Sequence, residues 1–224
     1  TTLQKLLEIH PQIYLPQCKE VQYFSLNSDK PVEWYSSYFS AANPGQKRGE
    51  ITPYYLFHSN APIRIKSLLP NIKLIALLRD PIERTLSQYF HAKRHGFEHL
   101  PLKEALLAEP QRMSSKDPYS HQKHSYISRS KYIEQLSRYE KLFSTEQMLV
   151  LRSEDLFNNS EVIWFKIQNF LDINEMPVPT ILPKANAGSG ESAEVSSEIR
   201  RWLKKEFATT VETVKRKYGF DWDW

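Results

Sequence analysis

An arginine and a serine eight residues apart could together hold a phosphate group. Arg79 directly follows a run of apolar residues, and Ser87 lies about two helical turns into the pattern that comes next. A guanidinium group offers a fork of donors to a phosphate, and spacings of three and four put Arg84, Ser87 and His91 on one helical face. The segment therefore predicts an anion-binding site, although a surface arginine beside a capped helix would show the same pattern.

The residues around Arg79 predict a strand, a tight turn and a helix. Residues 72–78 are almost wholly apolar, which is typical of a strand buried on both faces. Asp80 can cap the helix that follows, Pro81 fits its first position, and the helix is expected to end at about Arg94. Ligands of open α/β sheets bind at the carboxyl ends of strands, which is where Arg79 stands.

The rest of the chain continues this alternation of helices and strands. Further helices are expected at residues 2–10, 31–39, 126–143, 160–171 and 194–218, and further strands at residues 12–15 and 147–151. Asp29 is expected to cap the helix at 31–39, with Trp34, Tyr38 and Phe39 turned inward. Prolines and glycines mark residues 174–192 as a loop. The alternation predicts an α/β fold.

The composition fits one globular domain with a mild preference for anions. A chain of 224 residues, 40% hydrophobic and 25% charged, can bury one sizeable core. Its net charge of +4 carries no long basic block that would indicate nucleic acid. The single cysteine, Cys18, excludes an internal disulfide and a cysteine-based zinc site, and agrees with a cytoplasmic location. No apolar run approaches the roughly 18 residues of a membrane span, so no membrane partner is expected.

The Arg79 segment resembles the 3'-phosphate-binding segment of the PAPS-dependent sulfotransferases, in which an arginine at a strand end precedes a helical serine by eight residues. The likeness is closest to the heparan-sulfate type and its bacterial relatives. The matching segments are residues 19–24 (Lys-Glu-Val-Gln-Tyr-Phe), 34–35 (Trp-Tyr), 49–55 (Gly-Glu-Ile-Thr-Pro-Tyr-Tyr) and the Arg79 segment, in that order. The resemblance implies a single P-loop-type domain over residues 1–224, with three layers and a central parallel sheet flanked by helices. It implies transfer of a sulfuryl group from the nucleotide PAPS to a hydroxyl or amine, with PAP as product and no metal.

The resemblance also implies which residues bind the nucleotide. Arg79 and Ser87 would hold the 3'-phosphate, and Lys184 would reach it from a late loop. In this family a loop that contains a lysine and ends in Gly-Thr-Thr holds the 5'-phosphosulfate, and Thr1 and Thr2 look like that ending. Backbone N–H groups at a helix N-terminus suit a phosphate. The loop lysine and the first strand would then lie upstream of residue 1.

Two residues match groups that act on the acceptor in this family. Glu20 matches the general base, because a carboxylate facing an acceptor O–H or N–H can remove its proton as the sulfur is attacked in line. His91 matches a histidine of the N-sulfotransferase branch. Ile51 replaces a lysine of the heparan-specific O-sulfotransferases, which puts a heparan acceptor in doubt. A carbohydrate, an acyl chain or a small molecule is expected as the acceptor partner, and nucleic acid is not.

Two other functions fit the same residues. A P-loop kinase shares the fold and the threonine-ended loop, but it needs magnesium ligands, and Asp80 is the one acidic residue at a strand end. A non-catalytic domain that binds PAP or another nucleotide would lack the loop lysine. A magnesium titration combined with a PAP-binding assay separates a sulfotransferase from a kinase. The absence of a lysine from the sequence upstream of Thr1 would favour the non-catalytic binding domain.

Overall fold

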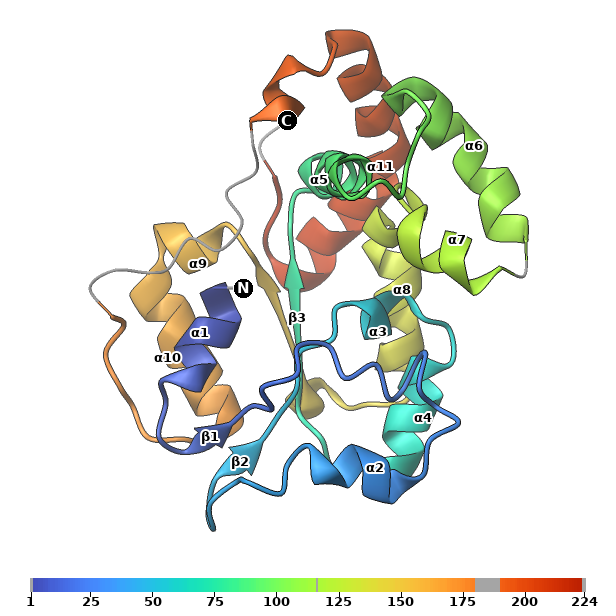
Figure 1. Cartoon of the computed structure of the whole chain (residues 1–224). Helices are drawn as coiled ribbons and strands as arrows, with labels where there is room; N and C mark the ends of the chain where they lie inside the picture. The colour runs from blue at the N-terminus through green and yellow to red at the C-terminus, as the bar shows by residue number, and fades with distance from the viewer. Residues whose placement is uncertain (1, 116, 180–189, 223–224) are drawn as a thin grey trace. The chain divides into compact units, whose positions relative to one another are not determined.

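The computed structural model describes residues 2–115, 117–179 and 190–222 of the chain (Figure 1). The chain forms two compact units. The first unit comprises residues 1–77 and 138–186, and the second comprises residues 78–137 and 187–224. Each unit has its own hydrophobic core.

The first unit contains the short strands and the helices that surround them. Its elements are α1 (Thr2–Glu8), β1 (Ile13–Tyr14), α2 (Val32–Ser37), β2 (Lys47–Arg48), α3 (Tyr54–Phe57), α4 (Ala61–Leu68), most of β3 (Leu74–Leu78), the end of α8 (Tyr132–Glu140), β4 (Met148–Arg152), α9 (Asp155–Asn158) and α10 (Ser160–Leu171). Strands β1 and β2 are parallel, with Ile13 opposite Lys47, and β3 pairs with β4. The strands in the described residues thus form two two-stranded sheets.

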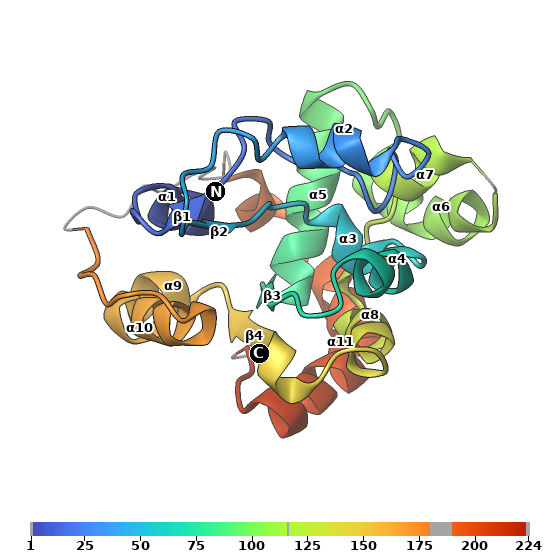
Figure 2. The ribbon, with the colours of Figure 1, turned by 90° about the horizontal axis from the view of Figure 1, so that it is seen from below.

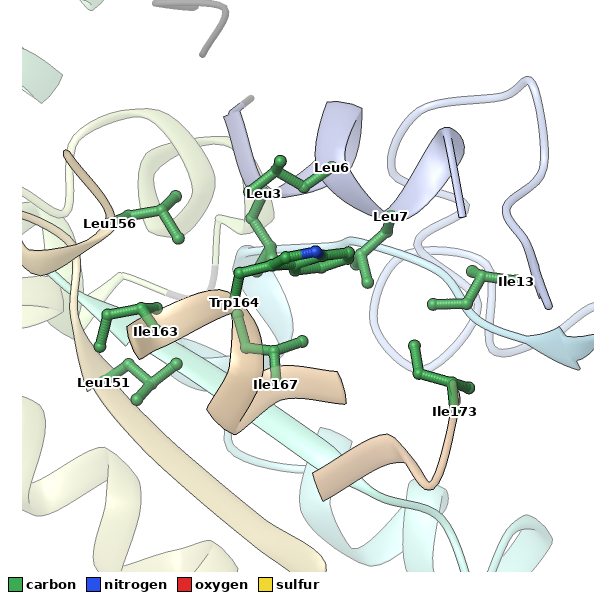
Figure 3. Close-up of a cluster of buried hydrophobic side chains, with 10 residues drawn as sticks. All are labelled: Leu3, Leu6, Leu7, Ile13, Leu151, Leu156, Ile163, Trp164, Ile167 and Ile173. Atoms are coloured by element: carbon green, nitrogen blue, oxygen red, sulfur yellow. The ribbon is translucent and has the colours of Figure 1, made fainter. Parts of the chain in front are cut away.

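Trp164 lies at the centre of one core of the first unit. Leu3, Leu6 and Leu7 share one face of α1 because of their helical spacing, and Figure 3 shows this face turned toward Trp164 of α10. A second core of the same unit is rich in aromatic residues. It consists of Val21, Phe24, Tyr35, Phe39, Tyr55, Ala61, Ile65, Tyr139 and Phe143. This second core packs around the segment that carries Glu20, and so links that segment to α2, α3 and α4.

The second unit is helical in its described part. Its elements are α5 (Pro81–Arg94), α6 (Leu102–Ser114), α7 (Pro118–Lys123), the start of α8 and α11 (Ser197–Tyr218). Helices α6 and α7 lie side by side (Figures 1 and 2). The core joins α5 to α11 and α6 through Leu86, Leu106, Leu203 and Phe207. Helix α5 begins as the sequence predicts, because the Asp80 carboxylate accepts a hydrogen bond from the Glu83 N–H at 2.9 Å.

The predicted cap of α2 is wrong. The helix begins at Val32 after Pro31, and no side chain caps it. The ring of Pro31 has a fixed φ that suits a helix start but offers no acceptor. Tyr35 and Phe39 are the buried aromatic residues of this segment, while Trp34 and Tyr38 are only partly buried.

The helix expected at residues 126–143 begins six residues later, at Tyr132. The carbonyl of Tyr126 accepts hydrogen bonds from the side chains of Arg84 and Thr85, at 2.6 and 3.2 Å. The N–H group of Ile127 donates to the carboxylate of Glu109 at 2.6 Å. These side chains take the backbone groups that an α-helix would use, so the segment forms bends and a short 3-10 helix, Ser128–Ser130, instead.

None of the helices in the described ranges is both long enough and apolar enough to cross a lipid bilayer.

Candidate functional site

Arg79 lies in the turn between β3 and α5, and its side chain is exposed. Its carbonyl accepts a hydrogen bond from the Tyr132 hydroxyl at 2.8 Å, which fixes the backbone of the turn. Within the described residues, the guanidinium group of Arg79 forms no hydrogen bond and no ion pair. The fold therefore holds the backbone of Arg79 in place and leaves five N–H donors for a ligand.

Ser87 lies on α5, beside the face that the helix buries. Its neighbour Leu86 is fully buried in the core of the second unit, whereas Ser87 is half-buried. Across the described part of the chain no hydrogen bond involves the Ser87 hydroxyl. The Ser87 hydroxyl can donate a hydrogen bond to an anion, and the Arg79 guanidinium group has free donors. The two residues are therefore suited to binding a phosphate.

Arg84 binds the protein's own backbone and does not stand open to a phosphate. Its Nε donates to the Ser130 hydroxyl at 2.6 Å, and one of its terminal nitrogens donates to the Tyr126 carbonyl at 2.6 Å. Burial lowers the pKa of the Arg84 guanidinium, and the positive charge of Arg79 acts in the same direction. Of the three residues expected on one phosphate-binding face, Arg84 thus has a structural role.

His91 is exposed near the end of α5 and stacks on the ring of His95. The two ring centroids are 4.2 Å apart, with an angle of 24° between the ring planes. Nδ1 of His95 also bonds to the carbonyl of His91 at 2.9 Å. The catalytic role expected for His91 stays a prediction.

Glu20 belongs to the first unit and sits in a strained turn. Its φ is 60° and that of Gln22 is 59°, a left-handed conformation that residues other than glycine seldom adopt. The Glu20 carboxylate is half-buried and accepts a hydrogen bond from the Gln22 amide at 3.1 Å. Such strain persists only where contacts with surrounding residues hold the backbone in place. The fold therefore fixes the direction of the Glu20 side chain.

Glu20 lines a small pocket in the first unit. The lining residues are Gln4, Leu15, Pro16, Cys18, Lys19, Glu20 and Ile51. Gln4 comes from α1, the helix that begins at Thr2, and Thr2 itself is 5% exposed. Two residues predicted to bind the nucleotide, Thr1 and Lys184, lie outside the described residues. The pocket thus brings together α1 and the turn of Glu20.

A half-buried carboxylate near Glu20, that of Glu50, was not recognised as functional from the sequence. Burial raises the pKa of Glu50, against the effect of hydrogen bonds from the hydroxyls of Thr52, Tyr35 and Tyr55. The sequence showed Glu50 only as part of a segment that resembles a family. The sequence feature that could have identified Glu50 is the set of hydroxyl-bearing residues near it. Thr52 and Tyr55 lie within five positions of Glu50, and Tyr35 lies on α2.

Within the described ranges no three His, Cys, Asp or Glu side chains gather as a metal site requires.

Comparison with known proteins identifies several relatives. A membrane-associated sulfotransferase of Dictyostelium discoideum, kil1, is 25% identical over 302 residues, which cover 100% of this chain and 64% of the relative. Human heparan sulfate glucosamine 3-O-sulfotransferase 3B1 is 27% identical over 78% of this chain and 43% of its own length. The bifunctional heparan sulfate N-deacetylase/N-sulfotransferase 1 of Caenorhabditis elegans is 27% identical over 81% of this chain and 22% of its own length. The chain spans less than two thirds of each of these relatives.

The fold agrees with these relatives. The crystal structure of a sulfotransferase from Alicyclobacillus acidocaldarius superposes with a TM-score of 0.82, covers 99% of this chain and 91% of its own, and is 24% identical in sequence. This match confirms the predicted α/β fold. The model of the sulfotransferase domain family matches residues 1–205. The chain belongs to the sulfotransferase family.

Proposed function

We propose that the chain transfers a sulfuryl group from PAPS to a hydroxyl or amine of an acceptor. The observation that carries the proposal is the turn between β3 and α5, where Arg79 presents an exposed guanidinium and Ser87 follows on the helix, in a chain of the sulfotransferase family. When bound, PAPS supplies the activated sulfuryl group, and PAP is the product that leaves.

In this proposal, five residues bind the nucleotide. Arg79 donates charge-assisted hydrogen bonds to the 3'-phosphate, and the Ser87 hydroxyl donates a further one. Thr1 and Thr2 bind the 5'-phosphosulfate through backbone N–H groups and hydroxyls at the start of α1. Lys184 adds a positive charge near the 3'-phosphate.

Glu20 accepts the proton of the acceptor group. As the acceptor oxygen or nitrogen forms its bond to sulfur, the bond between sulfur and the phosphate oxygen breaks, and PAP leaves with the electron pair of that bond. The proton passes to the Glu20 carboxylate, which lines a pocket and is held in one direction by its strained turn. His91 is the second candidate for this role.

A carbohydrate is the acceptor that we test first, because two relatives are named for heparan sulfate. Ile51 lines the same pocket as Glu20, where a lysine of the heparan-specific enzymes would place a positive charge, so the carbohydrate need not be heparan. An acyl chain and a small molecule are the other acceptor classes. A cytoplasmic location stays a prediction from the single cysteine, and the Dictyostelium relative is named membrane-associated.

Arg79→Ala should weaken the binding of PAP at least ten-fold. The change removes a charge-assisted contact worth about 1.5 to 3 kcal/mol, at about 1.4 kcal/mol per ten-fold change in affinity. Calorimetric titration with PAP measures the effect. Arg201→Ala is the matched control, since it removes the same charge from an exposed position on α11. Unchanged affinity in Arg79→Ala, or an equal loss in the control, would remove the main support for this nucleotide site.

Glu20→Gln should lower turnover by about 10²- to 10⁴-fold, the usual contribution of a general base, and leave the affinity for PAP unchanged. The amide keeps the shape of the side chain but cannot accept the proton. Transfer of radiolabelled sulfate from PAPS to unsulfated heparosan or to p-nitrophenol measures turnover. Glu33→Gln, at an exposed position on α2, is the control.

Near-normal turnover of Glu20→Gln would direct the search to His91. Tight binding of PAP without transfer to any acceptor would instead favour a non-catalytic nucleotide-binding domain.

A further inference from the structure

Glu50 is surrounded by hydroxyl groups that point at its carboxylate. One oxygen, Oε1, accepts hydrogen bonds from the hydroxyls of Tyr35 and Tyr55, at 2.9 and 3.1 Å. The other oxygen, Oε2, accepts one from the Thr52 hydroxyl at 2.8 Å. All three donors are less than 10% exposed. A carboxylate can accept about four hydrogen bonds, so this network uses most of the capacity of Glu50.

The same network holds the segment that follows Glu20 at two backbone positions. The N–H group of Val21, the next residue in the chain, donates to the Glu50 carboxylate. The N–H group of Phe24 donates to the Tyr55 hydroxyl at 3.3 Å, and that hydroxyl is bonded to Glu50. Both anchored residues are buried.

The anchored segment is also the strained one. Glu20 and Gln22 both have a positive φ, and Val21 lies between them. Val21 is held on both sides of its backbone, by Glu50 at its N–H group and by the Asn27 side chain at its carbonyl, at 2.9 Å. Without such anchors the backbone would relax to a conformation of lower energy and turn the Glu20 side chain elsewhere.

We propose that Glu50 is a positioning residue, which holds the turn of Glu20 so that the Glu20 carboxylate stays at its pocket. This proposal rests on the proposed role of Glu20 as proton acceptor. Glu50 acts through the backbone of Val21 and, by way of Tyr55, through that of Phe24. It takes no proton from the acceptor, because its two oxygens are already bonded to buried donors.

A double-mutant cycle tests the proposal. Glu50→Gln keeps the size of the side chain but places an amide group among hydroxyl donors. We expect turnover to fall about ten-fold or more, as small displacements of a catalytic group produce, while the affinity for PAP is unchanged. In the Glu20→Gln background the same change should alter turnover less than about two-fold, because residues that act as one unit are not additive.

Amide hydrogen exchange gives a readout that needs no acceptor. Exchange at Val21 and Phe24 should be faster in Glu50→Gln, since both N–H groups depend on the network. Glu98→Gln is the control, because Glu98 is a buried carboxylate of the second unit that also accepts a hydrogen bond from a tyrosine hydroxyl. It should leave exchange at Val21 and Phe24 unchanged.

If Glu50→Gln does not fold, two milder variants test the same proposal. Tyr55→Phe removes a donor to Glu50 together with the acceptor of the Phe24 N–H group, whereas Thr52→Val removes a donor to Glu50 and no contact with the segment 20–24. Tyr55→Phe should lower turnover and speed exchange at Phe24 more than Thr52→Val does.

Three results would overturn the proposal. The first is an equal loss of turnover from Glu50→Gln with Glu20 intact and with Glu20→Gln present. The second is unchanged exchange at Val21 and Phe24. The third is normal turnover in Glu20→Gln alone, which identifies a failure of the proposed proton acceptor, independent of any result with Glu50.

Discussion

Arg79 and Arg84 are five residues apart, carry the same side chain and have opposite surroundings. Arg79 is exposed after the last residue of β3, while the guanidinium group of Arg84 is enclosed by Ser130 and the carbonyl of Tyr126. The sequence suggested phosphate binding for both, because helical spacing shows which residues share a face but not what covers that face. The partners of Arg84 lie 46 and 42 residues further along the chain, beyond the reach of local patterns.

Arg84→Ala should lower the free energy of unfolding by about 1 to 3 kcal/mol, because it leaves buried acceptors without their donor. Urea unfolding followed by circular dichroism measures the change. Arg79→Ala serves as the comparison and should change the free energy of unfolding by less than about 0.5 kcal/mol, as exposed substitutions do. Equal losses in the two variants would contradict the difference in role.

At the scale of single elements, strand β3 and the helix α5 that follows it could be predicted from the sequence almost to the residue. Its signals are the apolar run, the Asp80 cap and Pro81, and all of them lie within the segment itself. The segment 126–131, which includes a 3-10 helix in place of an α-helix, could not be predicted, because it depends on Arg84 and on Glu109, which is 18 residues from its partner Ile127. Helices α4, α6 and α7 were not predicted either: α4 and α7 are short, with 8 and 6 residues, and α6 contains a proline.

Asp80→Ala should destabilise the protein by about 0.5 to 2 kcal/mol through loss of the α5 cap. Asp29→Ala offers a matched control, because Asp29 stands two residues before Pro31 but caps no helix. It should change the free energy of unfolding by less than about 0.5 kcal/mol. Thermal and urea unfolding of both variants measure the difference, and a similar loss from Asp29→Ala would mean that helix capping is not the cause.

At the scale of the whole molecule, each unit holds a carboxylate in a network of hydrogen bonds, and the pKa values of these two carboxylates, Glu50 and Glu98, shift in opposite directions. In the first unit, burial raises the pKa of Glu50, whose partners are neutral hydroxyls and one N–H group. In the second, burial also acts to raise the pKa of Glu98, but hydrogen bonds from Arg112, the Leu100 N–H and the Tyr126 hydroxyl outweigh it and bring the pKa to about 2. The arginine makes the difference, because its charge stabilises the ionised form.

Glu98 should make the protein sensitive to acid. A carboxylate with a lowered pKa stabilises the folded state above its ordinary value of 4.5, and this contribution is lost as the pH falls toward about 2. Glu98→Gln should therefore reduce the free energy of unfolding at pH 7, and the deficit should shrink as the pH falls below 4.5. Urea unfolding at a series of pH values measures this. A deficit that is constant with pH would contradict the assignment.

Glu50 contributes with the opposite sign. Its raised pKa favours the protonated form in the folded state, so its contribution to the free energy of unfolding is present below pH 4.5 and is lost as the pH rises through the raised pKa.

The class of the fold and its central strand and helix, β3 and α5, were predictable from the sequence. The two buried networks were not, because their donors come from separate helices, loops and turns.

The position of Cys18 gives the molecule a single chemical handle. Its thiol is exposed and is the only one in the sequence, and Cys18 lines the same pocket as Glu20. A thiol-reactive dye would therefore attach at one known position, beside the proposed proton acceptor. Fluorescence from that dye could report when a molecule enters the pocket, before any acceptor for the chain has been identified.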